Sequence, residues 1–223
     1  ASAASVDYPA LLVRISTSDN SRNLNITGTA DKSALNTWTT NGEQNENWRF
    51  DLVGSDSNGT YFKIVNQGSG RLLTPMGYEV TEGTEAVLFG SESAKEQHWY
   101  VIPVSQDKYG SDLHYKIVNY ADTNMALTYN ASANTVTLNK YTGAESQKWL
   151  LNAAGLQGFG GYAKDMSGSV KASTIGGLFG KVIEVSTFDE LKAACTSTEP
   201  ATVVITKNIS GKTGSSNYQT ASG

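Results

Sequence analysis

Three tryptophans each follow an amide or carboxylate side chain by two positions, and this pairing recurs at a nearly constant interval. The triplets are Glu46-Asn47-Trp48, Gln97-His98-Trp99 and Gln147-Lys148-Trp149, which places the tryptophans 51 and 50 residues apart. An indole ring can stack on a ligand, but it also buries a large apolar area and needs an acceptor for its N–H. Because residues two apart share one face of a strand, Gln97 and Gln147 could brace a turn beside a buried ring. We therefore expect the tryptophans to belong to the core.

Other kinds of chemistry have little support in the sequence. The chain has two histidines and one cysteine, Cys195, so it offers no His/Cys cluster for zinc and no intrachain disulfide. Cys195 lacks a nucleophile signature, and its place on a predicted helix face indicates a buried thiol. The formal net charge is −4 without any Lys/Arg cluster, which argues against nucleic acid as a partner. No apolar run approaches transmembrane length, so we expect no membrane partner.

Short apolar runs recur with the same period as the tryptophans and must position them. Residues 62–66 return as residues 115–119, and residues 12–16 are a weaker first copy. Gly, Asn, Asp and Ser separate these runs, a pattern typical of strands joined by turns. About four strands per unit, repeated three times, predict a closed threefold all-β architecture whose units share one core.

Three repeats with a Gln-x-Trp near the end of each resemble the ricin-B-type β-trefoil, the fold of family 13 carbohydrate-binding modules. The resemblance covers roughly residues 6–152. In that family, each repeat can supply one shallow sugar pocket. The pocket uses an early Asp, an aromatic residue ten positions before the tryptophan, and an Asn three residues after the aromatic. The corresponding residues here, repeat by repeat, are Asn25, Trp38 and Asn41; Thr74, Phe89 and Glu92; and Thr128, Asn139 and Thr142.

The repeats depart from the family pattern to different extents. None keeps the Asp, which would accept strong hydrogen bonds from neighbouring sugar hydroxyls. The first repeat retains a ring and two amides and is the best candidate, the second keeps a ring and a carboxylate, and the third lacks its ring unless Tyr141 substitutes. The resemblance thus implies carbohydrate binding by Asn25, Trp38, Asn41, Glu46, Phe89 and Glu92, with structural roles for Trp48, Gln97, Trp99, Gln147 and Trp149. Alternatively, Trp38 is a surface or interface aromatic on a degenerate repeat.

The composition changes after residue 152, where glycine becomes frequent and tryptophan disappears. Residues 181–185 read as a strand, and Thr187 with Glu190 three residues later forms the signature of a capping box. Pro200 disfavours continuation of the helix, and residues 202–206 are β-branched enough for a second strand. The predicted apolar helix face consists of Phe188, Leu191, Ala194 and Cys195.

Residues 156–210 resemble the N-terminal start of polysaccharide lyase family 1, the pectate lyases, whose fold is a right-handed parallel β-helix. The shared features are glycine-rich stretches at 158–163 and 174–182, a capping helix, and a strand that ends near Ile209. The resemblance implies β-elimination with Ca²⁺ held by aspartates and an arginine as base. Calcium needs six to eight oxygen ligands, but residues 156–223 contain two aspartates and no arginine. We therefore expect no catalytic residue, metal ligand or cofactor here, and Ca²⁺ only in a lyase domain that this chain lacks.

These patterns predict an all-β chain with two parts. Residues 1–152 form a carbohydrate-binding β-trefoil, and residues 153–223 form the truncated cap of a pectate-lyase-like β-helix with a flexible tail. The small polar residues 1–5 resemble what remains after signal-peptide cleavage. On the expected function we predict a secreted protein, which we also expect to be bacterial and monomeric. The expected function is to hold an attached lyase on plant cell-wall polysaccharide. The alternative is a trefoil that packs on the lyase domain without binding sugar, and the lyase-like segment argues against a toxin-type lectin subunit.

Overall fold

The computed structural model describes residues 12–108, 110–154, 181–198 and 201–210. The chain divides into two compact units between Ile175 and Gly176, and each is described by itself. Both predicted glycine-rich stretches lie mainly in residues 155–180, and the predicted flexible tail lies mainly in residues 211–223, so they fall outside the described residues.

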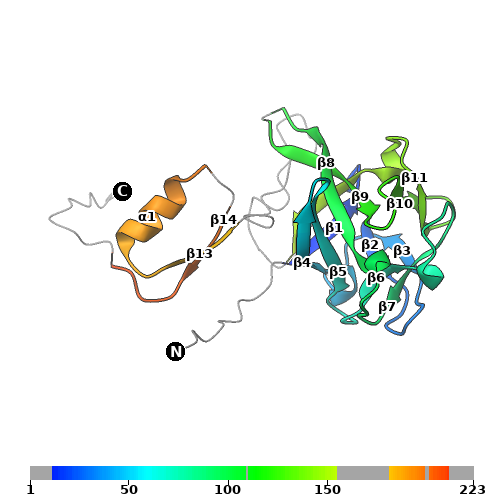
Figure 1. The fold of residues 1–223 in the computed structure, drawn as a ribbon, viewed down its shortest axis with the longest axis horizontal. Coiled ribbons are helices and arrows are strands. Elements are labelled where there is room, and N and C mark those ends of the chain that lie inside the picture. The colour runs from blue at the N-terminus through cyan, green and yellow to red at the C-terminus, as the bar shows by residue number, and fades with distance from the viewer. Residues whose placement is uncertain (1–11, 109, 155–180, 199–200, 211–223) are drawn as a thin grey trace, which may run out of the picture. The chain divides into compact units, whose positions relative to one another are not determined.

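The first unit is all-β and contains twelve strands, four to a repeat (Figure 1). The strands are β1 (Leu12–Thr17), β2 (Asn23–Ile26), β3 (Leu35–Trp38) and β4 (Trp48–Asp56); β5 (Gly59–Asn66), β6 (Leu72–Pro75), β7 (Ala86–Phe89) and β8 (Trp99–Gln106); β9 (Asp112–Asn119), β10 (Met125–Asn130), β11 (Thr135–Lys140) and β12 (Trp149–Ala153). A 3-10 turn precedes each triplet tryptophan, and a further one follows β6. These turns are η1 (Gln44–Glu46), η3 (Lys95–Gln97), η4 (Glu145–Gln147) and η2 (Met76–Tyr78).

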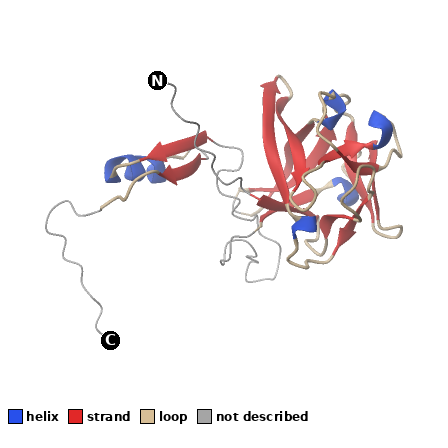
Figure 2. Cartoon of the chain, turned by 90° about the horizontal axis from the view of Figure 1, so that it is seen from below, coloured by secondary structure: helices blue, strands red, loops and turns tan. Residues whose placement is uncertain are grey.

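Six of the strands close into a ring, which confirms the predicted threefold trefoil. β1 pairs with β4 and β12, β5 pairs with β4 and β8, and β9 pairs with β8 and β12, all antiparallel. The remaining strands form the hairpins β2–β3, β6–β7 and β10–β11 (Figure 2). Closure leaves the ring without an exposed sheet edge. The last strand ends at Ala153, and the buried Ala154 still donates its N–H to Leu12, so the domain extends slightly past the expected boundary at 152.

The three triplet tryptophans lie in the core, as predicted. Trp48, Trp99 and Trp149 are each 0% exposed. Their indole N–H groups donate to the equivalent carbonyls of Leu24, Leu73 and Leu127 at 2.9, 3.0 and 2.9 Å. Each ring therefore buries its apolar area and satisfies its one polar group, which is what a core indole requires.

The glutamines of the second and third triplets brace their turns, also as predicted. Gln97 accepts the N–H of Glu92 at 2.8 Å and donates to the carbonyl of Gly90 at 2.8 Å and to the hydroxyl of Thr74 at 3.1 Å. Gln147 makes the same bonds to Thr142, Lys140 and Thr128. One buried amide thus joins three chain segments in each of these repeats.

The second unit has the predicted strand–helix–strand order. β13 (Lys181–Val185) pairs in parallel with β14 (Ala201–Ile205), and α1 (Phe188–Thr196) lies between them in sequence. The predicted capping box is present, since Thr187 Oγ1 accepts the Glu190 N–H and Glu190 Oε2 accepts the Thr187 N–H. In the described part of the chain, no helix is long and apolar enough to cross a membrane.

Cys195 is exposed, so the prediction of a buried thiol was wrong. The face of α1 is amphipathic, but a two-stranded sheet is too narrow to cover the whole of it. Leu191 and Ala194 take the half-buried positions, whereas Phe188 remains 39% exposed.

Candidate functional site

The outer face of the β2–β3 hairpin gathers the first-repeat candidates. Asn25 lies opposite Asn36, and Asn23 lies opposite Trp38. Cross-strand partners in an antiparallel pair project to one side of the sheet, and the alternate residues, such as Leu24, project into the core. Trp38 therefore shares its face with three asparagines, and it leaves 49% of its surface exposed. This is the only tryptophan outside the core.

Asn25 carries an acceptor that has no donor. Its Nδ2 donates to Asn36 Oδ1 at 2.9 Å and to the Ile26 carbonyl at 3.1 Å, and these two acceptors fix the orientation of the amide. Its Oδ1 is buried and receives no hydrogen bond, and the residue is only 6% exposed. An unpaired buried polar atom destabilises the fold by about 1–3 kcal/mol, so its presence calls for an explanation.

In the other two repeats, the residues equivalent to Asn25 have hydrogen-bond partners for their side chains. The indole acceptors align Asn25 with Thr74 and Thr128. Both threonine hydroxyls accept a hydrogen bond from the triplet glutamine, Gln97 or Gln147. Both also donate onward to a backbone carbonyl of their own strand. These two positions are therefore fully used within the fold.

Glu46 explains why the first repeat differs. A carboxylate only accepts hydrogen bonds, so it cannot donate to Asn25 as a glutamine would. Glu46 instead accepts from Asn23 Nδ2 at 3.0 Å and from the N–H groups of Gly42 and Asn41 at 2.9 and 3.3 Å. Asn25 Oδ1 is thereby left for a donor from elsewhere.

The structure places Glu46 in a turn rather than on the exposed face, which corrects its inclusion among the sugar-contacting residues. It is 1% exposed and occupies the position of Gln97 and Gln147. Asn41, by contrast, is exposed, and its amide oxygen accepts the Glu43 N–H at 2.9 Å. Its amide nitrogen is thus available at the surface three residues after Trp38.

Two residues that the sequence did not single out support the strand carrying Trp38. Arg22 donates to the Thr37 carbonyl at 2.6 Å and to Asn134 Oδ1 at 3.3 Å, and its Cζ lies 6.0 Å from the Trp38 ring centroid. Asn134, in the β10–β11 turn, also accepts the Thr37 N–H at 3.1 Å. The third repeat therefore braces the first-repeat site. Arg71 directly precedes β6, as Arg22 directly precedes β2. Alignment of the repeats could therefore have singled out Arg22.

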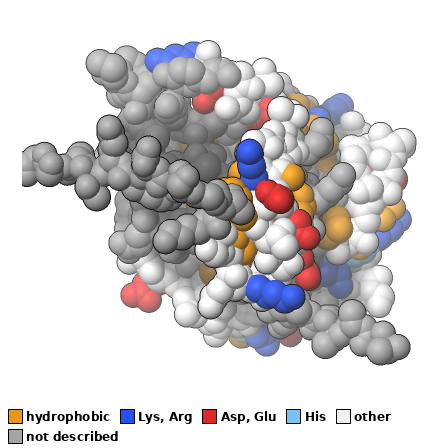
Figure 3. Space-filling view, turned by 90° about the vertical axis from the view of Figure 1, so that its left-hand side faces the viewer, with side chains coloured by type: hydrophobic (Ala, Val, Ile, Leu, Met, Phe, Trp, Pro, Cys, Tyr) orange, Lys and Arg blue, Asp and Glu red, His pale blue; other side chains and the backbone are white. Residues whose placement is uncertain are grey.

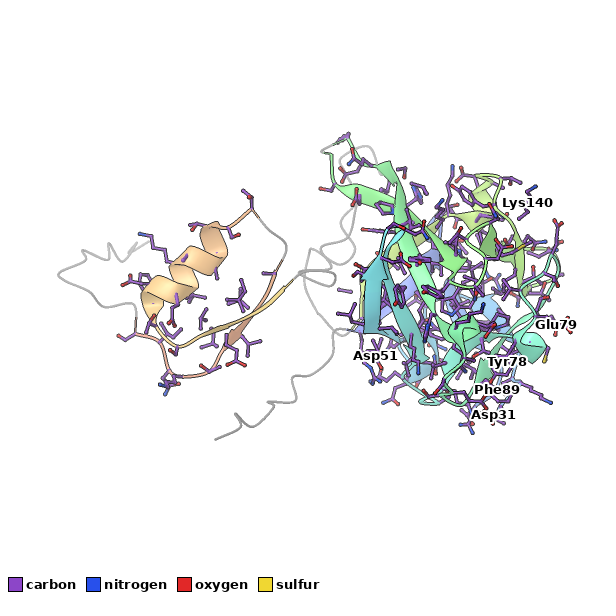
Figure 4. The ribbon with its side chains drawn as sticks, in the orientation of Figure 1. Asp31, Asp51, Tyr78, Glu79, Phe89 and Lys140 are labelled. Carbon is purple, nitrogen blue, oxygen red and sulfur yellow. The ribbon has the colours of Figure 1, made fainter. Side chains whose placement is uncertain are left out.

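The second repeat has an additional ring beside Phe89. Tyr78, on η2, meets Phe89 edge-to-face with centroids 5.6 Å apart, and Figure 4 shows both near Asp31. The Tyr78 hydroxyl is buried beside the Glu92 carboxylate, and burial together with that carboxylate raises the pKa of Tyr78 to about 12. Glu92 is itself exposed. Phe89 and Glu92 thus lie with a second aromatic residue that sequence reasoning missed.

The candidate groups of the third repeat are engaged within the fold. Asn139 Oδ1 accepts the Thr137 hydroxyl at 2.7 Å. Tyr141, the possible substitute ring, packs against the core cluster that contains Tyr100. The ammonium of Lys116 lies 4.6 Å from its ring centroid. Tyr141 therefore offers less free ring surface than Trp38 does.

Figure 3 shows acidic and basic side chains close to one another among the described atoms of the face turned to the viewer. Described His, Cys, Asp and Glu side chains form no group of three or more that could hold a metal ion. The distinctive chemistry of the first repeat is therefore an exposed ring beside amides.

Comparison with known proteins shows what the first unit resembles. Residues 44–137 match the family model "Ricin-type beta-trefoil lectin domain-like". The fold is similar to the designed threefold-symmetric protein ThreeFoil, with 20% identity, a TM-score of 0.55, and coverage of 63% of this chain and 96% of that chain. It is also similar to the Rhizoctonia solani agglutinin, with 16% identity, a TM-score of 0.51, and coverage of 66% and 98%. Residues 44–137 thus resemble the ricin-type lectin-like family, and the first unit has a β-trefoil fold.

The same domain fold occurs inside larger enzymes. The exo-β-1,3-galactanase of Clostridium thermocellum matches with 20% identity and a TM-score of 0.56, over 64% of this chain but only 30% of that chain. A comparison with curated proteins gives no match. The structural similarities establish the fold.

Proposed function

We propose that the trefoil is a carbohydrate-binding module that holds an attached pectate-lyase-like enzyme on plant cell-wall polysaccharide. The observation that carries the proposal is the half-exposed Trp38 beside Asn25, whose buried amide oxygen has no donor. Sugars are bound by an aromatic ring against their C–H face together with hydrogen bonds to their hydroxyls. The first repeat offers both, and the ricin-type lectin-like family supports this use of the fold.

In the proposed complex, a sugar ring stacks on Trp38, and a rearrangement of the hairpin face opens the buried Asn25 Oδ1 to one of the sugar hydroxyls. The exposed amide of Asn41 supplies a donor from the neighbouring turn. Such a site is shallow and binds weakly by itself. The Phe89–Tyr78 pair with Glu92 is a plausible second site, and two weak sites on one polymer raise the overall affinity through effective concentration.

The attached lyase is supported by the second unit. The parallel pairing of β13 and β14 and the capped helix α1 are compatible with the beginning of a parallel β-helix. In this proposal the protein is a secreted bacterial monomer. Catalysis and Ca²⁺ belong to a lyase domain beyond these residues, and no chemical step is assigned to this chain.

Affinity electrophoresis tests the proposal. The full chain is run through native gels containing homogalacturonan, galactan, arabinan or xylan, beside Trp38→Ala and the control Leu52→Ala. Leu52 is 69% exposed on the β4–β5 hairpin, so its truncation also removes exposed apolar surface but outside the β2–β3 hairpin. We expect retardation by a pectic polymer that Trp38→Ala loses and Leu52→Ala keeps. Equal retardation of Trp38→Ala and the parent would refute the site.

The alternative is a trefoil that serves protein contact without binding sugar. Leu52 and Val53, 69% and 40% exposed at the β4–β5 hairpin, favour it because exposed apolar side chains often mark interfaces. This alternative predicts no retardation of the parent in any of the four gels.

A further inference from the structure

Arg22 carries a positive charge that meets no carboxylate in the described part of the chain. Its hydrogen bonds go to uncharged acceptors, namely the Thr37 carbonyl and hydroxyl and the Asn134 side-chain oxygen. These bonds use Nε and Nη2. A guanidinium has five N–H donors, so the two on Nη1 are left without an acceptor. The cation is thus held firmly, 6.0 Å from the centre of the Trp38 ring, and no described residue uses its charge or its Nη1 donors.

At the equivalent position of the second repeat, the charge of Arg71 is paired with a carboxylate. It precedes β6 as Arg22 precedes β2, but its Nε donates to Asp31 Oδ1 at 2.6 Å. That hydrogen bond lowers the pKa of Asp31, which keeps the carboxylate ionised beside the arginine. Asp31 also accepts the Gly90 N–H at 2.9 Å. The fold therefore neutralises Arg71 internally, whereas no described residue supplies a counter-ion to Arg22.

The unused Nη1 donors of Arg22 have a definite chemical complement. A guanidinium N–H that donates to a carboxylate oxygen makes a charge-assisted hydrogen bond, which is stronger than a neutral one. Neutral sugars offer only hydroxyls and would leave the charge unpaired. A sugar that bears a carboxylate on its ring could stack on Trp38 and reach Nη1 at the same time.

We propose that the first-repeat site takes an acidic glycan, a chain of uronate residues, whose carboxylate pairs with Arg22 while a sugar face lies on Trp38. Asn25 Oδ1 then accepts a hydroxyl of the same residue. This inference rests on the proposed function and narrows its ligand from plant cell-wall polysaccharides in general to the uronate-containing ones. Arg22 becomes the residue that determines specificity, and Asn134 the residue that positions it.

Calorimetric titration with short oligogalacturonates and their methyl esters tests this assignment, because esterification replaces the carboxylate charge with a small methyl ester and leaves the sugar rings and hydroxyls unchanged. We expect the full chain to bind the acid about tenfold more tightly than the ester, as one charge-assisted hydrogen bond implies. The preference declines as salt is raised. In Arg22→Gln, acid and ester bind alike. Arg71→Gln is the matched control and retains the preference, because the charge it removes is already paired.

The controls separate the possible failures. Arg22→Lys keeps the charge but loses the planar fork, so an intermediate preference is expected if pairing geometry matters. Equal binding of acid and ester by the parent, or an undiminished preference in Arg22→Gln, overturns the uronate assignment. If the parent binds both ligands alike and Trp38→Ala binds neither, the preference for acidic glycans is refuted but the proposed function stands. If Trp38→Ala binds as the parent does, or the parent binds neither ligand, the proposed function and this inference fail together.

Discussion

Gln147→Ala separates a structural role for the triplets from a role in binding. Gln147 is 2% exposed and makes bonds to the Thr142 N–H, the Lys140 carbonyl and the Thr128 hydroxyl at 2.8, 2.9 and 3.2 Å. Each net hydrogen bond contributes about 0.5–1.5 kcal/mol, and truncation removes three part-buried hydrogen bonds. We expect a loss of about 2–4 kcal/mol in the free energy of unfolding, while glycan binding at the first repeat stays unchanged.

Urea denaturation followed by tryptophan fluorescence measures this loss in the trefoil alone, because all four tryptophans lie at or before residue 149. The expected loss moves the urea midpoint by about 1–2 M for ordinary slopes. Glu145→Gln is the surface control, since its ion pair with Lys148 is exposed and contributes about 0–1 kcal/mol. A change below about 1 kcal/mol in Gln147→Ala, or lost glycan binding with unchanged stability, would refute the structural role of the triplet.

Three further outcomes follow from particular contacts. Asn134→Ala removes the acceptor that holds Thr37 and Arg22, so glycan affinity should fall about three- to tenfold without loss of a ligand contact; unchanged calorimetric affinity would contradict this. The Tyr100 hydroxyl, 2.6 Å from Asp56, lowers the pKa of that carboxyl. The stabilising contribution of Asp56 is therefore full above the ordinary aspartate pKa of about 3.9 and is lost as pH falls through the lower folded pKa. Urea midpoints measured across this window should fall less in Asp56→Asn than in the parent. The exposed Cys195 should react with a thiol reagent as fast in the native protein as in urea, and strong native protection would contradict its placement.

The repeat period carried most of the information about the fold. A Gln-x-Trp signal recurring in phase predicts three equivalent units, and the equivalent indole hydrogen bonds to Leu24, Leu73 and Leu127 realise that equivalence. The capping box of Thr187 and Glu190 was also predictable, because it depends on residues three apart. Local rules and periodicity thus suffice where the deciding contacts are local or repeated.

The candidate site was less predictable because its deciding contacts are neither local nor repeated. Glu46 reads as a surface carboxylate, and only the folded turn brings three N–H donors to it. Asn134 meets Thr37 across 97 residues of sequence. Tyr78 adopts a positive φ of 60° directly after Gly77, so its direction could not be inferred from strand alternation. Sequence reasoning found Trp38 but not the residues that position it.

The most direct test of sugar binding at Trp38 is an NMR titration of the indole N–H signals with a pectic oligosaccharide. Three of the four indoles are buried and hydrogen-bonded to carbonyls, whereas Trp38 is half-exposed. Its signal can be assigned as the one missing from the spectrum of Trp38→Phe. We predict that the Trp38 signal shifts progressively and saturates while those of Trp48, Trp99 and Trp149 stay in place. A Trp38 signal that does not move under conditions where the polymer is bound would contradict the assignment of the first repeat as the binding site.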